Sequence, residues 1–215
     1  MFRTVIMPWP STITRAFATV EGGAAIAVHE NQYYGPYNKL LHTPFPADSD
    51  FIVSPNYIPG KIDGGGDFIV SLETTFHQHP VLILGVKPPQ HLSFNSTREA
   101  ADRQIRRRLI DLSGVWRPSR CRLRSHDLTA EFLPSGRAPL PVLYGISAIG
   151  TKLCFYEFEK APMHMTPRRI PNDPEFTTDV APQERWDCDV LEANGEQRLR
   201  ALATQITGAC ERLQA

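Results

Sequence analysis

The sequence lacks a membrane-spanning segment, a secretory signal and the paired cysteines of a zinc site. No two of its four cysteines lie within 20 residues of each other, so there is no CxxC metal pair. Such scattered thiols indicate a reduced, intracellular protein of the cytoplasm or nucleus. No run of 18 apolar residues occurs, which excludes a membrane-spanning helix. The apolar run before Pro8 has only three residues, too few for the core of a secretory signal.

The sequence also lacks an excess of charge of either sign. Lys plus Arg and Asp plus Glu each number 23 in 215 residues, so no global basic field favours nucleic acid, and any such preference must be local. The locally basic region is 98–124. Neither a GxGxxG dinucleotide motif nor a GxSxG nucleophile motif is present.

The apolar patterning predicts a single α/β domain with a mixed central sheet flanked by helices. We expect an irregular leader over 1–22 and then one domain over 23–215, with a proline-rich excursion at 160–183. Three helices are predicted. The first lies within 29–41, and the second follows an N-cap at Ser96 that forms a capping box with Glu99. The third follows a cap at Asn194 and carries its apolar residues along one face: Leu199, Leu202, Ile206 and Leu213. The predicted strands are 50–58, 66–76, 80–87, 141–149 and 151–159.

Two of these strands, 66–76 and 80–87, form a predicted antiparallel hairpin. Their loop is centred near residue 77 or 78, and a centre near 77 would place Asp67 opposite Lys87 and next to Gly85. Because side chains alternate along a strand, Gly85 and Lys87 share a face and Val86 points the other way. An acid and a lysine would therefore meet at the open end of an otherwise apolar hairpin. The plainer alternatives are a turn residue at Asp67 and a lysine that extends into solvent.

This hairpin resembles the core of the PD-(D/E)xK nuclease superfamily, in which an acid precedes an apolar strand that ends in (D/E)-x-K. The matching residues are Asp67 and then Gly85-Val86-Lys87, followed by a helix that contains Gln104. The segment "YGISAIGTKLCFYEF" resembles a later strand pair of restriction-type members. The layout "YGPYNKLL … KPP … RWDCDVLEA" is similar to a fungal, basidiomycete-type branch.

The resemblance implies a restriction-endonuclease-like fold and a metal site. Asp67 and the Val86 carbonyl would hold Mg²⁺ or Mn²⁺ in an active member, and no metal would be required in an inactive one. Lys87 would be the catalytic lysine, with Gln104 beside it. Gly85 stands where the second carboxylate is expected, which predicts impaired catalysis.

Two other acids are candidates to replace the missing carboxylate. Asp63 lies in the glycine-rich stretch before the hairpin, and Glu30 lies in the first predicted helix. A single carboxylate would hold Mg²⁺ weakly, because this ion keeps most of its waters unless several oxygens are supplied.

Arginines on the predicted helix after Ser96 are candidate contacts to nucleic-acid phosphates. The apolar stripe of this helix consists of Ala101, Ile105, Leu109 and Leu112. Arg103, Arg106 and Arg107 should face away from it, and Arg108 should point toward the sheet edge with Gln104. The plainer reading is a solvated helix face.

Two functions follow as expectations. The first is a metal-dependent, nuclease-like phosphodiesterase domain that acts on or binds DNA or RNA, with cleavage impaired by Gly85. The alternative is a non-enzymatic interaction domain that keeps the fold as a scaffold and uses an apolar patch to form a homodimer or to hold another partner.

Overall fold

A seven-stranded mixed sheet forms the centre of the molecule. The computed structural model describes residues 9–22, 29–59, 68–76, 79–113, 140–173, 175–176 and 178–214. The strands are β1 (Phe51–Pro59), β2 (Phe68–Phe76), β3 (His79–Lys87), β4 (Val142–Ile149), β5 (Lys152–Glu159), β6 (His164–Thr166) and β7 (Cys188–Asp189). Their order is β1-β2-β3-β4-β5-β6, with β7 also paired to β5, and β3 and β4 are parallel while the other pairs are antiparallel. The predicted α/β class and mixed sheet are therefore confirmed.

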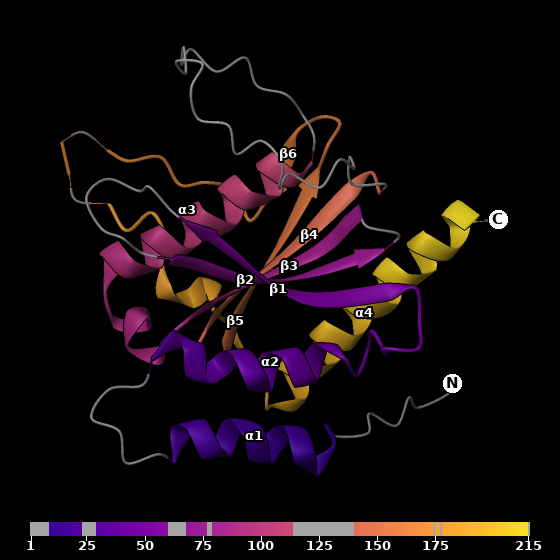
Figure 1. Cartoon of the computed structure of the whole chain (residues 1–215). Coiled ribbons are helices and arrows are strands. Elements are labelled where there is room, and N and C mark those ends of the chain that lie inside the picture. Colours follow the sequence, from indigo (N-terminus) through magenta and orange to yellow (C-terminus); the bar gives the residue numbers. More distant parts are fainter. Residues whose placement is uncertain are drawn as a thin grey trace, which may run out of the picture.

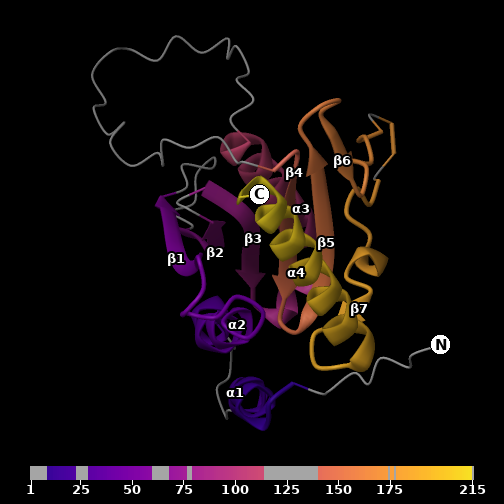
Figure 2. The same ribbon diagram turned by 90° about the vertical axis from the view of Figure 1, so that its right-hand side faces the viewer.

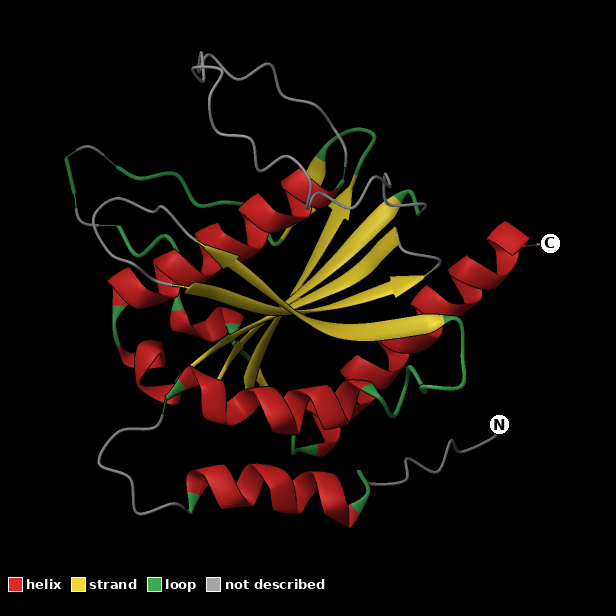
Figure 3. Cartoon of the chain, in the orientation of Figure 1, coloured by secondary structure: helices red, strands yellow, loops and turns green. Residues whose placement is uncertain are grey.

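Helices cover both faces of this sheet. They are α1 (Ser11–Glu21), η1 (Glu30–Tyr33), α2 (Tyr34–Leu41), η2 (Pro89–Ser93), α3 (Asn95–Leu112), η4 (Gln183–Arg185) and α4 (Ala193–Gln214). Figure 1 and Figure 3 show α3 on one side of the strands and α4 on the other, with α1 and α2 near one end of the sheet. Figure 2 shows α4 crossing the sheet in the view turned by 90°. Within the described part of the chain, no helix has the length and apolar composition needed to cross a bilayer.

Strand alternation divides the buried side chains into two clusters. On one face, Ile83 of β3 and Tyr156 of β5 pack with Ile105 and Leu109 of α3. On the other face, buried β-strand residues pack with α1, α2 and the Leu199–Leu202–Ile206 side of α4. Parallel strands need a crossover connection, and α3 lies in the connection between β3 and β4. The α3 helix therefore packs over the two strands that it joins.

Three details differ from the sequence-based expectations. The predicted leader contains α1, whose Ile13 and Phe17 are buried, because Pro10 occupies the N-cap position and does not interrupt the helix. Both predicted helix caps are wrong, because α3 begins at Asn95 and α4 begins at Ala193, so Ser96 and Asn194 lie inside the helices. In α4, Leu213 is 52% exposed, whereas the other three predicted core residues are buried, because the last turn extends past the sheet.

The hairpin register decides between the two predicted loop centres. Gly85 pairs with Ser71, as a loop centred at residue 78 requires, whereas a centre at 77 would pair it with residue 69. The pairs nearest the loop follow a register that differs by one residue, because the register shifts between Thr74 and Thr75. The centre at 77, on which the placement of Asp67 opposite Lys87 depended, is therefore wrong. Asp67 itself lies outside the described residues, as does Asp63.

Candidate functional site

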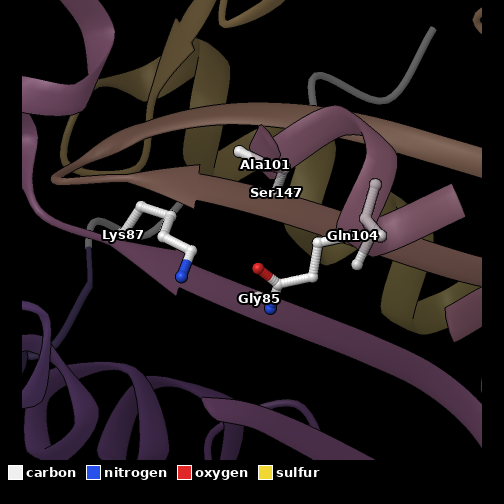
Figure 4. Close-up of a pocket in the computed structure, with 6 residues that line it drawn as sticks. Gly85, Lys87, Ala101, Gln104 and Ser147 are labelled. Carbon is white, nitrogen blue, oxygen red and sulfur yellow. The ribbon is translucent and has the colours of Figure 1, made fainter. Parts of the chain in front are cut away.

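The end of β3 brings the predicted lysine and the glycine to one face, beneath α3. Gly85 lies beside Ser147 of β4 in the parallel register, and Lys87 lies beside Ile149. These positions form a small cavity of about 10 Å³ that Ala101, Gln104 and Ile105 of α3 help to line. Figure 4 shows the Lys87 side chain and the Gln104 amide converging beside Gly85. The space suits about one water-sized group.

Gly85 is not required by the packing of α3. A Cβ atom placed on Gly85 would meet only Ile105 Cδ1, at an ordinary contact distance of 3.8 Å. The neighbouring glycine in β4 is different, because a Cβ on Gly145 would come within 3.0 Å of Leu109 and 3.1 Å of Ile105. Close helix approach therefore explains Gly145, but it does not explain Gly85, where a Cβ atom would make only an ordinary contact.

Lys87 is held by an acid from another part of the chain. Its Nζ lies 3.2 Å from Oε2 of Glu30, and the two side chains are 14% and 28% exposed. The other carboxylate oxygen of Glu30 accepts a hydrogen bond of 3.1 Å from the hydroxyl of Tyr34. Glu30 was one of two candidates to replace the missing carboxylate, and its position in η1 brings it to Lys87.

The backbone around Lys87 is fixed by the β4–β5 turn. Gly150 donates its N–H to the carbonyl of Lys87 at 2.8 Å, and its own carbonyl accepts from the Tyr37 hydroxyl at 2.7 Å. Gly150 has φ +60°, a left-handed conformation that favours glycine, and a Cβ there would lie 2.9 Å from Cβ of Pro89. The strand end that carries Lys87 is therefore anchored on two sides.

The described residues do not fit a magnesium site by themselves. Glu30 is the carboxylate at Lys87, and it already accepts two hydrogen bonds. The Val86 side chain is buried on the opposite face of β3 and holds no oxygen, so this residue could offer only its backbone carbonyl. Across the ranges that the structure describes, no group of three or more His, Cys, Asp and Glu side chains is placed to hold a metal. Mg²⁺ prefers several oxygen ligands, so we derive no metal-dependent step from this arrangement.

The arginines of α3 separate into exposed and buried groups. Arg103 and Arg107 are 58% and 69% exposed, as predicted, and Arg108 is half-buried. Arg106 was predicted to face solvent, and this is wrong. Its guanidinium donates to Asp102 at 2.6 Å and to the carbonyl of Pro167 at 2.7 Å. The partner from the proline-rich excursion, 61 residues away, is what buries it.

Asp102 is the centre of a buried polar network that sequence reasoning missed. Besides Arg106, its carboxylate accepts from Arg185 at 2.8 Å and from the Tyr156 hydroxyl at 2.9 Å. Burial, with Cys154 and Asp102 as further causes, raises the pKa of Tyr156, which keeps its hydroxyl a donor. The spacing of Asp102 and Arg106 by four residues was the available signal for a helical ion pair.

Arg98 makes a second connection between α3 and the excursion. It is buried, and it pairs with Asp179 and donates to the carbonyls of Ala181 and Leu92. The basic region predicted over 98–124 is therefore partly structural, because Arg98 and Arg106 both hold the excursion. Its part from 114 onward lies outside the described residues.

Comparison of the chain with protein-family models, with curated proteins and with solved structures gives no significant match.

Proposed function

We propose that this chain is a nuclease-like domain that binds DNA or RNA and whose phosphodiester cleavage is impaired at Gly85. The observation that carries the proposal is a shared cavity. It is lined by Lys87 and Gln104, two positions at which the sequence resembles the PD-(D/E)xK superfamily, and by Gly85, the position at which it departs from that pattern. A restriction-endonuclease-like fold is part of the same proposal. It is supported by a hairpin strand that ends in the lysine and by the helix α3 that follows it.

Lys87 supplies the cation for a phosphate in this proposal. Its side chain is 14% exposed, and a phosphate would have to replace Glu30, whose Oε2 lies 3.2 Å from the ammonium. In such a partly desolvated place a cation stabilises the negative charge of a phosphate more strongly than in bulk water. The Gln104 amide lies beside the same space and can donate a further hydrogen bond.

Cleavage is impaired in this proposal because the oxygen ligands are too few. Glycine at 85 supplies no carboxylate, and Glu30 is engaged by Lys87 and Tyr34. The space beside Gly85 admits a Cβ atom, whose nearest neighbour would be Ile105 Cδ1 at 3.8 Å. The longer side chain of a glutamate would have to extend out of the cavity of about 10 Å³ or move its lining residues.

The exposed side of α3 supplies the proposed contact to the nucleic-acid backbone. Arg103 and Arg107 face solvent with their carboxylate neighbours 3.8 and 3.9 Å away, distances beyond a good hydrogen bond. Such exposed pairs contribute little, so each guanidinium can turn toward a phosphate at small cost.

The experiment is a binding titration of labelled single- and double-stranded DNA and RNA, followed by fluorescence anisotropy at several salt concentrations. We expect the full chain to bind, and the Arg103→Gln/Arg107→Gln double variant to bind more weakly. On duplex DNA the slope of log K against log salt should fall by about 2, roughly one unit for each lost phosphate contact.

The matched control is Arg212→Gln, which removes an exposed arginine from the last turn of α4, the helix on the opposite face of the sheet from α3. It should retain the affinity and the salt slope of the unchanged chain. If the unchanged chain binds no nucleic acid at low salt, or if the double variant matches it, the proposal fails and the interaction-domain alternative replaces it.

A further inference from the structure

A second and much larger cavity lies on another side of α3. It measures about 480 Å³ and opens between α3, the end of β5 and the chain around β6. This volume is within the usual range of small-molecule sites, roughly 300–1,000 Å³. It shares no lining residue with the cavity at Gly85 and Lys87.

One wall of this cavity is apolar and includes two methionines. Phe158, Met163, Met165 and Ile110 contribute to it. Met163 has φ 66°, and it is the one residue other than glycine with a positive φ among those that the structure describes. A side chain is unfavourable in this conformation, yet a methionine rather than a glycine stands there, 44% exposed at the cavity. Thioether groups make favourable contacts with aromatic rings.

The other wall carries charges of both signs and is partly fixed, because three of its arginines pair with the carboxylates of Glu99, Asp102 and Asp111. Arg106 is locked by Asp102 and Pro167 and lies over the Tyr156 ring, 5.3 Å from its centroid. Asp102 is neutralised by two guanidinium groups, those of Arg106 and Arg185. This part of the wall needs no rearrangement to receive a ligand.

Arg169 gives the cavity its available positive charge. Its side chain is exposed, and within the described part of the chain it forms no hydrogen bond or ion pair. Arg103 lines the same cavity, with Glu99 only at 3.8 Å. A guanidinium without a fixed partner can bind a carboxylate, sulfonate or phosphate through two parallel hydrogen bonds.

We infer that this cavity binds a small aromatic anion, with the ring between the two methionines and Phe158 and the anionic group at Arg169. The shape and volume of the cavity limit the ligand to small-molecule size, and the positive charge of Arg169 favours an anion. The inference does not rest on the proposed function. Arg103 and Arg107 line this cavity and also serve the proposed nucleic-acid contact, so the test uses Arg169 and Met163, which that contact does not involve.

The test uses 1-anilinonaphthalene-8-sulfonate, an aromatic sulfonate, titrated into the full chain and followed by its fluorescence. We expect saturable binding of one molecule per chain. Arg169→Gln should weaken it on the order of ten-fold, the effect of losing one charge-assisted hydrogen-bonded pair. Arg212→Gln and Lys87→Ala should leave the affinity unchanged.

The Met163→Gly variant distinguishes a loss of ligand affinity from a loss of folding stability. Glycine suits the positive φ, so the melting temperature should stay equal or rise, whereas the affinity should fall several-fold because apolar contact is lost. Displacement by a nucleoside monophosphate or by an aromatic carboxylate then shows which anionic group is preferred. Binding that does not saturate, or equal affinity in the Arg169, Met163 and control variants, would overturn the inference.

Discussion

Replacing Asp102 by alanine should destabilise the protein by about 3–5 kcal/mol, the usual cost of removing one partner from a buried ion pair. The carboxylate is 8% exposed and faces Arg106 and Arg185, whose side chains are 10% and 9% exposed. Both guanidinium groups would lose their anion inside the protein, and Tyr156 would lose its acceptor. In a chain of this length the melting temperature should fall by about 10 °C or more.

A matched control for this substitution lies on the same helix. Glu99 pairs with Arg103 at 3.8 Å, and both side chains are at least 36% exposed. Glu99→Ala should therefore change stability by less than about 1 kcal/mol. Urea unfolding of both variants makes the comparison. An Asp102→Ala loss no larger than that of Glu99→Ala would contradict the role assigned to the buried network.

Replacing Gly195 by alanine should destabilise the protein although alanine favours helices. A Cβ on Gly195 would lie 1.9 Å from the carbonyl oxygen of Asp189 and 2.5 Å from its carbonyl carbon. These are backbone atoms of β7, so the start of α4 or the strand must move. We expect a loss of about 1–3 kcal/mol or more, the cost of overpacking, after the helix preference of alanine has been offset.

Gly208 in the same helix gives the opposite expectation. A Cβ there would meet only the end of the flexible Arg212 side chain, at 3.6 Å. Gly208→Ala should therefore stabilise the protein by about 0.5–1 kcal/mol. Thermal unfolding of the two variants should give shifts of opposite sign. Stabilisation by both substitutions would mean that the close contact between α4 and β7 does not form.

The parts of the fold that the sequence predicted are those with local causes. The apolar strands 80–87 and 141–149 and the Ala101–Ile105–Leu109 stripe of α3 each carry their own pattern, and the structure has these elements within one or two residues. Because Gly85, Lys87 and Gln104 belong to consecutive elements of this kind, their meeting could be anticipated.

The parts that were missed depend on distant partners. Arg106 looks like an exposed helix residue until Pro167 and Arg185 return to α3 and enclose it. The register of the hairpin changes by one residue between Thr74 and Thr75, an irregularity that no pattern of apolar residues encodes. The contact of Glu30 with Lys87 joins positions 57 residues apart, so the sequence offered Glu30 only as one of two candidates.

The most direct test of the nuclease-like site is a cleavage assay on labelled DNA and RNA with Mg²⁺ or Mn²⁺. It compares the unchanged chain with Gly85→Glu, with Gly85→Gln and with Gly85→Glu/Lys87→Ala. The glutamine variant has the shape of the glutamate variant without its charge, so it separates a restored metal ligand from a filled cavity. Melting temperatures verify that all four proteins are folded.

The account predicts that Gly85→Glu alone cuts, and that adding Lys87→Ala abolishes cutting. That result would mean that the cavity is a nuclease site that glycine at position 85 inactivates. If folded Gly85→Glu is as inactive as Gly85→Gln, or if the unchanged chain already cuts and keeps cutting as the Lys87→Ala variant, the central claim is contradicted.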